Sequence, residues 1–90
     1  METSGNKKEA YMATKEQVAA QLMMIETVHG IRLVNRDRLI DTIAGNAGDR
    51  RTASFVTAAI NSWVAVSGIE GEAEVPDDLL ARIFRNFAMR

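Results

Sequence analysis

Residues 35–67, NRDRLIDTIAGNAGDRRTASFVTAAINSWVAVS, hold the strongest secondary-structure signal in the chain. Apolar side chains recur there every three or four positions, which is the spacing that places them on one face of a helix. The pattern predicts two amphipathic helices joined by a glycine-bearing corner. The apolar stripe of the first helix comprises Leu39, Ile40, Ile43, Ala44 and Ala47, and that of the second comprises Val56, Ala59, Ile60, Trp63 and Val64.

Capping residues mark both helices of this predicted hairpin. Asn35 stands where the first helix begins and is a favoured N-cap residue, and Val34 and Leu39 have the spacing of a hydrophobic staple around it. Asp49 stands at the start of the second helix, and Gly68 follows its last turn. Glycine is common at that place because a helix often ends on a residue in the left-handed conformation. We therefore expect two separately capped helices.

Similar signals predict one helix before the hairpin and one after it. Thr14 and Gln17 have the spacing of a capping box, and Gly30 is placed to end the helix that they open. Pro76 suits the first turn of a last helix, which runs to about Met89. The chain is therefore expected to contain four helices.

The segments between and before the helices lack such patterns. Residues 31–34 are predicted to be a short link, whose alternating pattern could make a brief extended segment but is too short to predict a sheet. Residues 69–74 are predicted to be an acidic loop. Residues 1–13 are polar and are predicted to be a disordered tail, which leaves residues 14–90 as a single helical domain. We expect an all-α fold, with four short helices in a small bundle or orthogonal array.

Composition limits the classes of function. The chain has 90 residues, a formal net charge of −1 and no Cys, so neither disulfides nor thiolate-bound zinc can stabilise it. A core of this size is marginal on its own, which predicts a homo-oligomer, with a dimer as the expected form. No apolar run reaches the ~20 residues of a membrane span, and the first ten residues lack the apolar core of a secretion signal. We therefore expect a cytoplasmic protein with no membrane partner.

The titratable residues do not predict an enzyme. His29, the only His, falls in the last turn of a predicted helix, where a cation complements the helix dipole. One His and no Cys leave no set of metal ligands and no nucleophile with its base. Asp77 and Asp78 are adjacent on a predicted helix, so their side chains diverge by about 100°. We expect no catalysis, cofactor, metal or small-molecule substrate.

An unusual charge pattern marks the start of the second central helix. Arg50 and Arg51 fall in its first turn, where the helix dipole disfavours cations by about 0.3–1 kcal/mol. A phosphate group would offset that cost, because it can accept hydrogen bonds from free helix N–H groups and from two guanidinium groups. Arg36 and Arg38 could extend the same surface. These four arginines are the candidate nucleic-acid contacts, and ordinary solvated side chains are the alternative interpretation.

The central stretch also resembles a known family. The run NRDRLIDTIAGNAG at residues 35–48 is similar to the opening helix and turn of the HU/IHF nucleoid proteins, and the next helix aligns if two extra residues are allowed at the corner. In that family the hairpin builds the dimer core, and nearby basic residues touch the DNA backbone. The resemblance covers about a third of the chain and lacks the family's β-arms. It implies a dimerising hairpin without implying DNA bending.

A looser similarity involves both ends of the chain. Residues 75–83, VPDDLLARI, and residues 11–18, YMATKEQV, look like parts of small phage head–tail adaptor proteins, which are helical subunits that act in rings. This similarity implies a protein–protein adaptor with exposed Met and aromatic side chains as its interface anchors. The expected anchors are Met23, Met24, Phe55, Phe84 and Phe87.

Two hypotheses about function follow. The first is a small regulatory or architectural protein that dimerises through its central helices and contacts a nucleic-acid backbone, such as DNA, through the four arginines. The alternative is a protein–protein adaptor of phage or plasmid type in an oligomeric assembly. The expected core and dimer interface comprises Leu39, Ile43, Val56, Ile60, Trp63, Phe84 and Phe87.

Overall fold

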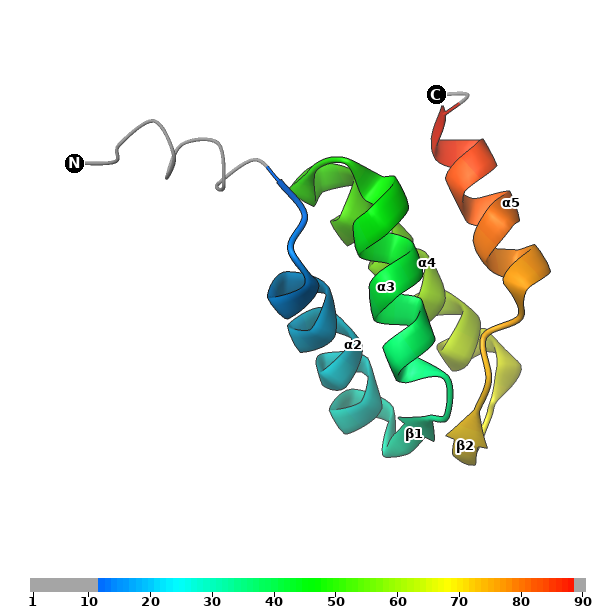
Figure 1. The fold of residues 1–90 in the computed structure, drawn as a ribbon. Helices are drawn as coiled ribbons and strands as arrows, with labels where there is room; N and C mark the ends of the chain where they lie inside the picture. The colour runs from blue at the N-terminus through cyan, green and yellow to red at the C-terminus, as the bar shows by residue number, and fades with distance from the viewer. Residues whose placement is uncertain (1–11, 89–90) are drawn as a thin grey trace.

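The protein is all-α with a minor two-stranded sheet (Figure 1). Its structure is a computed structural model that describes residues 12–88. The predicted disordered tail lies outside the described residues except for Met12 and Ala13. In chain order the elements are α2 (Lys15–His29), β1 (Ile31–Leu33), α3 (Arg36–Ala47), α4 (Arg50–Ser67), β2 (Gly71–Ala73) and α5 (Asp77–Ala88). The four expected helices are present, together with two short strands.

Helix α4 is the longest helix and the one around which the others pack. It lies behind α3 in Figure 1 and contacts α2, α3 and α5. Helix α2 also packs against α3, whereas α5 lies on the far side of α3 from α2 (Figure 1). The sheet closes one end of the bundle, where β1 follows α2 and β2 precedes α5.

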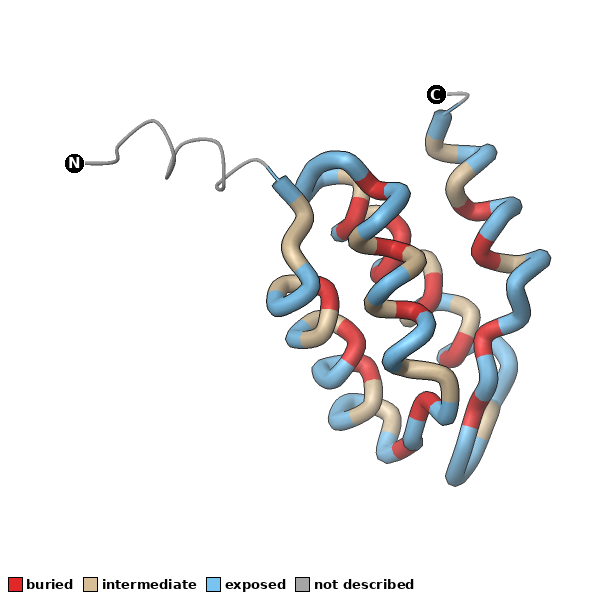
Figure 2. Tube along the Cα trace, in the orientation of Figure 1, coloured by how far each residue is buried: buried red, intermediate tan, exposed pale blue. Residues whose placement is uncertain are grey.

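The core is formed by the apolar stripes of all four helices. Figure 2 shows the buried residues on the inward side of each helix. Burial of one such aliphatic side chain stabilises a fold by about 1.5–3 kcal/mol. The largest fully buried side chains are Leu22, Leu39, Ile43, Ile60, Val18, Val56, Val64 and Val75. These apolar contacts all lie within one chain.

Local capping explains where two of the helices, α2 and α4, begin or end. The Thr14 hydroxyl accepts the Gln17 N–H at 3.1 Å and opens α2, and Gly30 ends it in the left-handed conformation with φ 65°. Gly68 ends α4 in the same way, with φ 64°. The reciprocal half of the predicted capping box is absent, because the Gln17 Oε1 atom is buried without a hydrogen-bond partner among the described residues.

The two segments predicted to be a link and a loop contain strands. Strand β1 pairs in parallel with β2, and Ile31 lies opposite Gly71. The Val34 N–H extends the pairing by donating to the Ala73 carbonyl at 2.9 Å. Each strand is only three residues long and pairs with a segment about forty residues away. Its local sequence pattern is therefore too short to predict the pairing.

Asn35 does not cap α3 as predicted. Its side chain makes no capping hydrogen bond, and instead the Nδ2 atom donates to the Val75 carbonyl at 3.0 Å. The Oδ1 atom accepts the Val75 N–H at 3.3 Å. The carboxamide therefore continues the β1–β2 pairing and satisfies both polar groups of Val75, which is 1% exposed. Val34 is 42% exposed, so the predicted hydrophobic staple buries Leu39 but little of Val34.

Candidate functional site

The structure separates the four candidate arginines into two groups. Arg36 and Arg38 lie in the first turn of α3, whereas Arg50 and Arg51 begin α4 beyond the other end of α3. Helix α3 has 12 residues and is therefore about 18 Å long. The four guanidinium groups do not form one cluster.

The arginines of α3 both have carboxylate partners. The Arg36 Nη1 atom lies 2.7 Å from the Glu26 Oε1 atom, and the Arg38 Nη2 atom lies 2.5 Å from the Asp77 Oδ2 atom. The Glu26 side chain is 12% exposed, whereas those of Arg38 and Asp77 are 64% and 65% exposed. Each of these two guanidinium groups therefore already has a carboxylate partner within the chain.

Glu26 has a structural role that the sequence pattern did not indicate. Its Oε2 atom accepts the Leu33 N–H at 2.8 Å while Oε1 accepts from Arg36. One carboxylate thereby joins the last part of α2, the end of β1 and the start of α3. No local signal predicts this contact, because it depends on the turn that brings β1 back along α2.

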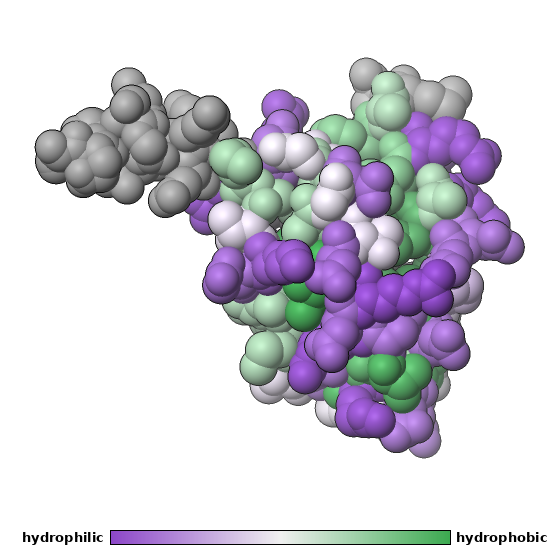
Figure 3. Space-filling view, in the orientation of Figure 1, coloured by the Kyte–Doolittle hydropathy of each residue, from purple (hydrophilic) through white to green (hydrophobic). Residues whose placement is uncertain are grey.

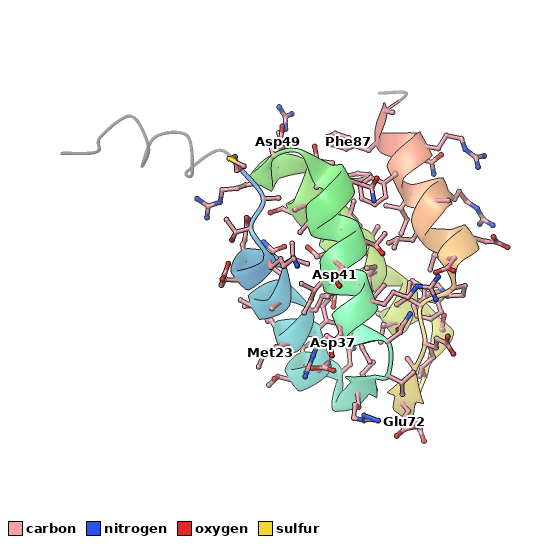
Figure 4. The ribbon with its side chains drawn as sticks, in the orientation of Figure 1. Met23, Asp37, Asp41, Asp49, Glu72 and Phe87 are labelled. Atoms are coloured by element: carbon pink, nitrogen blue, oxygen red, sulfur yellow. The ribbon has the colours of Figure 1, made fainter. Side chains whose placement is uncertain are left out.

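Asp49, which is labelled in Figure 4, and the two arginines that follow it at the start of α4 form the other charged group. The Asp49 Oδ1 atom accepts the Thr52 N–H at 2.8 Å, as predicted for an N-cap. Hydrogen bonds from the backbone and side chain of Thr52 lower the pKa of the Asp49 carboxyl, and the charge of Arg51 lowers it further. Arg50 and Arg51 are exposed, so the N-terminus of α4 is a basic end with one acidic cap.

A line of polar contacts joins α2 to α4. The Gln21 Nε2 atom donates to the Ser54 hydroxyl at 3.1 Å, and the Thr57 hydroxyl donates to the Gln21 Oε1 atom at 2.7 Å. His29 lies in the last turn of α2 as predicted, and its Nε2 atom is 2.7 Å from the Asn61 Oδ1 atom. These polar groups therefore satisfy one another within the chain.

A shallow apolar groove runs along the same α2–α4 junction. Its volume is about 270 Å³. Two apolar side chains of its lining are strongly exposed, Met24 at 65% and Val28 at 68%. The lining residues are Gln21, Met24, Ile25, Val28, Ser54, Thr57, Ala58 and Asn61. None of these lining side chains carries a formal charge.

The outward side of α4 is unusual because it bears no charge for four turns. Residues 52–69 contain no Asp, Glu, Lys or Arg. The exposed positions there follow helical spacing, so they lie on one side of α4 and continue from the groove. We define the uncharged α2–α4 face as Met24, Val28, Ser54, Ala58, Ser62 and Ala65.

The predicted core and interface residues separate into two groups by burial. Leu39, Ile43, Val56 and Ile60 are at most 2% exposed and are covered by the helices of their own chain. The half-buried residues are Trp63, Phe84 and Phe87. An interface with another molecule must therefore use side chains other than the first four.

The predicted adaptor anchors also differ in their exposure to solvent. Met23 and Met24 are 51% and 65% exposed. Phe55 is half-buried, and its ring centroid lies 4.8 Å from that of Phe87. Figure 4 shows Phe87 directed from α5 toward the neighbouring helices. The methionines are available to a partner, whereas the two phenylalanines fasten α5 to α4.

Comparison with known proteins finds no relative. No family model, no curated protein and no solved structure matches the chain. Within residues 12–88, no group of three or more His, Asp or Glu side chains is placed to hold a metal ion. None of the helices in that range is both long and apolar enough to cross a membrane.

Proposed function

We propose that this protein is a non-enzymatic interaction module that associates with copies of itself through the uncharged α2–α4 face. The single observation that supports this proposal is the charge-free outward side of α4 beside exposed Met24 and Val28. Solvated helices usually carry charged residues opposite the core. The centres of protein interfaces, in contrast, are depleted of charge and enriched in Met.

The chemistry of the face favours a second copy as partner. In a two-fold symmetric dimer the same patch meets itself, so any charge near the axis would face a like charge. A patch without charge avoids that repulsion. Ser54, Ala58, Ser62 and Ala65 are small, so they allow a neighbouring helix to approach closely, and Met24 is flexible enough to fill the remaining gaps. This arrangement supports the assembly role of an adaptor.

The solution mass of substituted proteins tests this proposal. We expect the parent to have a mass greater than one chain by light scattering and Ala58→Arg to have the mass of a monomer, because a buried unpaired charge opposes association. Ala81→Arg, at an exposed position of α5, is the matched control and should remain associated. Both variants should keep the helical signal and melting temperature of a folded chain. A monomeric parent at high micromolar concentration would overturn the proposal.

Contact with a nucleic-acid backbone is a second candidate function. It is supported by the exposure of Arg50 and Arg51 at the N-terminus of α4, where helix N–H groups favour an anion. We expect Arg50→Glu with Arg51→Glu to abolish a salt-dependent shift of duplex DNA. The matched control is Arg82→Glu with Arg85→Glu, which makes the same change of charge on exposed α5. Equal binding by the two double variants would remove this candidate.

A further inference from the structure

A second groove lies between α3 and α5, on the opposite side of α3 from α2. It has a volume of about 620 Å³, which falls within the usual range of about 300–1,000 Å³ for small-molecule sites. Figure 3 faces this side, and apolar colour is visible there between the hydrophilic side chains of the two helices. The lining residues are Arg38, Thr42, Asn46, Asp77, Leu80, Ala81, Phe84 and Ala88.

The two walls of this groove have different chemistry. The α3 wall presents Arg38, Thr42 and Asn46 at successive four-residue intervals, so three polar side chains line one face of that helix. The α5 wall presents mainly apolar side chains along more than two turns. Those apolar residues are Leu80, Ala81, Phe84 and Ala88. A ligand that matched both walls would have an apolar body and a polar group.

The Arg38–Asp77 ion pair bridges the two walls at one end of the groove. Both side chains are about two-thirds exposed, and exposed pairs of this kind add little net stability. A guanidinium has five N–H donors in a planar fork, so Arg38 can donate to a second carboxylate beside Asp77 or in place of it. The groove therefore offers a guanidinium at one end and an apolar wall along α5.

We propose that the α3–α5 groove binds a small carboxylate with an apolar body. Its carboxylate would contact Arg38, and its apolar body would lie along Leu80 and Phe84. The span from Arg38 to Asn46 along α3 is about 12 Å, which sets the length of the body. This site shares no residue with the uncharged α2–α4 face, so it is independent of the proposed self-association.

Nuclear magnetic resonance titration with octanoate, and with octanol as the neutral counterpart, tests the site. Octanoate should produce saturable shifts confined to residues 38–46 and 77–88, and octanol should bind more weakly. The titration is repeated in Ala58→Arg, so that binding and self-association are measured separately. Shifts on the α2–α4 face alone, equal affinity for the two probes, or no saturable shift would each overturn the proposal.

Two charge variants make the test specific to the ion pair. Arg38→Gln should weaken octanoate binding about tenfold, because a charge-assisted contact is lost. Asp77→Asn should strengthen it several-fold, because the competing carboxylate is removed while the side-chain shape is kept. Neither change should alter octanol binding. Octanoate affinities that are the same in all three proteins would exclude Arg38 as the carboxylate partner.

A filling variant tests whether the probe occupies the groove itself. Ala81→Trp places a large side chain in the groove and should abolish binding of both probes. Ala58→Trp makes the same change on the α2–α4 face and should leave both affinities unchanged. Circular dichroism establishes that each variant is folded. Persistent octanoate binding by folded Ala81→Trp would place the probe elsewhere and overturn the assignment.

Discussion

Asp49 and Asn35 are similar in size and precede consecutive helices, yet they have different roles. The Asp49 carboxylate accepts a hydrogen bond from the first turn of α4, which is the local role that its sequence position predicts. The Asn35 carboxamide both donates to and accepts from the backbone of Val75. A carboxylate could only accept there, because an ionised Asp has no donor. The residue type at each position therefore matches the partners that tertiary structure supplies.

Acid should weaken the fold partly through Asp49. Its pKa in the folded protein is lowered from the ordinary value of 3.8, so its contribution to stability is present above that value and is lost as pH falls through the folded pKa. Asp49→Asn keeps the cap without the charge and should lose less of its melting temperature between pH 7 and pH 3 than the parent does. Asp49→Ala removes the cap, so its melting temperature should be lower at pH 7. Parallel pH profiles for the parent and Asp49→Asn would contradict this attribution.

At the scale of elements, α5 is the helix whose position depends most on a few contacts. It contacts α4, and it borders α3 across an open groove. Leu80 and Ile83 are buried, and Phe87 meets the Phe55 ring at an interplanar angle of 49°. A tilted pair of aromatic rings contributes specific stability beyond the area that it buries. The phenylalanine pair thus holds the end of α5 that lies furthest from the sheet.

The strength of this attachment can be measured with a double-mutant cycle. Phe55→Leu and Phe87→Leu should each destabilise the fold, and the double variant should show a coupling energy of about 0.5–1.5 kcal/mol from urea unfolding. Leu preserves most of the apolar volume, so the cycle reports the ring contact. Phe87→Leu combined with Met24→Leu on α2 is the control and should be additive within about 0.5 kcal/mol. Additivity in the first cycle would mean that the rings do not interact in solution.

At the scale of the whole molecule, the packing of the core within one chain determines how self-association would occur. The stripes of four helices meet in one core, and Leu22, Ile43, Val56 and Ile60 are completely buried without a second chain. Self-association through the uncharged α2–α4 face would therefore join chains that are already folded. This is why the Ala58→Arg variant is expected to remain a folded monomer. An obligate dimer, in contrast, would lose its fold when the interface is disrupted.

The helices could be predicted from the sequence more closely than the grouping of the charged residues. The apolar periodicity of α4 and its caps at Asp49 and Gly68 predicted that helix closely, because both depend on contacts within a few residues. The grouping of Arg36, Arg38, Arg50 and Arg51 could not be predicted in the same way. Their separation depends on the length of α3 and on carboxylates from other elements.

The sequence by itself determined the all-α class, the four helices and the faces that they bury, because helix periodicity and capping are local properties. Tertiary structure alone decided that residues 31–33 and 71–73 form a sheet, and that Glu26 and Asp77 neutralise two arginines. It also decided that an open groove lies between α3 and α5. Each of these features joins segments far apart in the chain. The local sequence of a three-residue strand or of a single ion pair carries too little conformational preference to predict its partner.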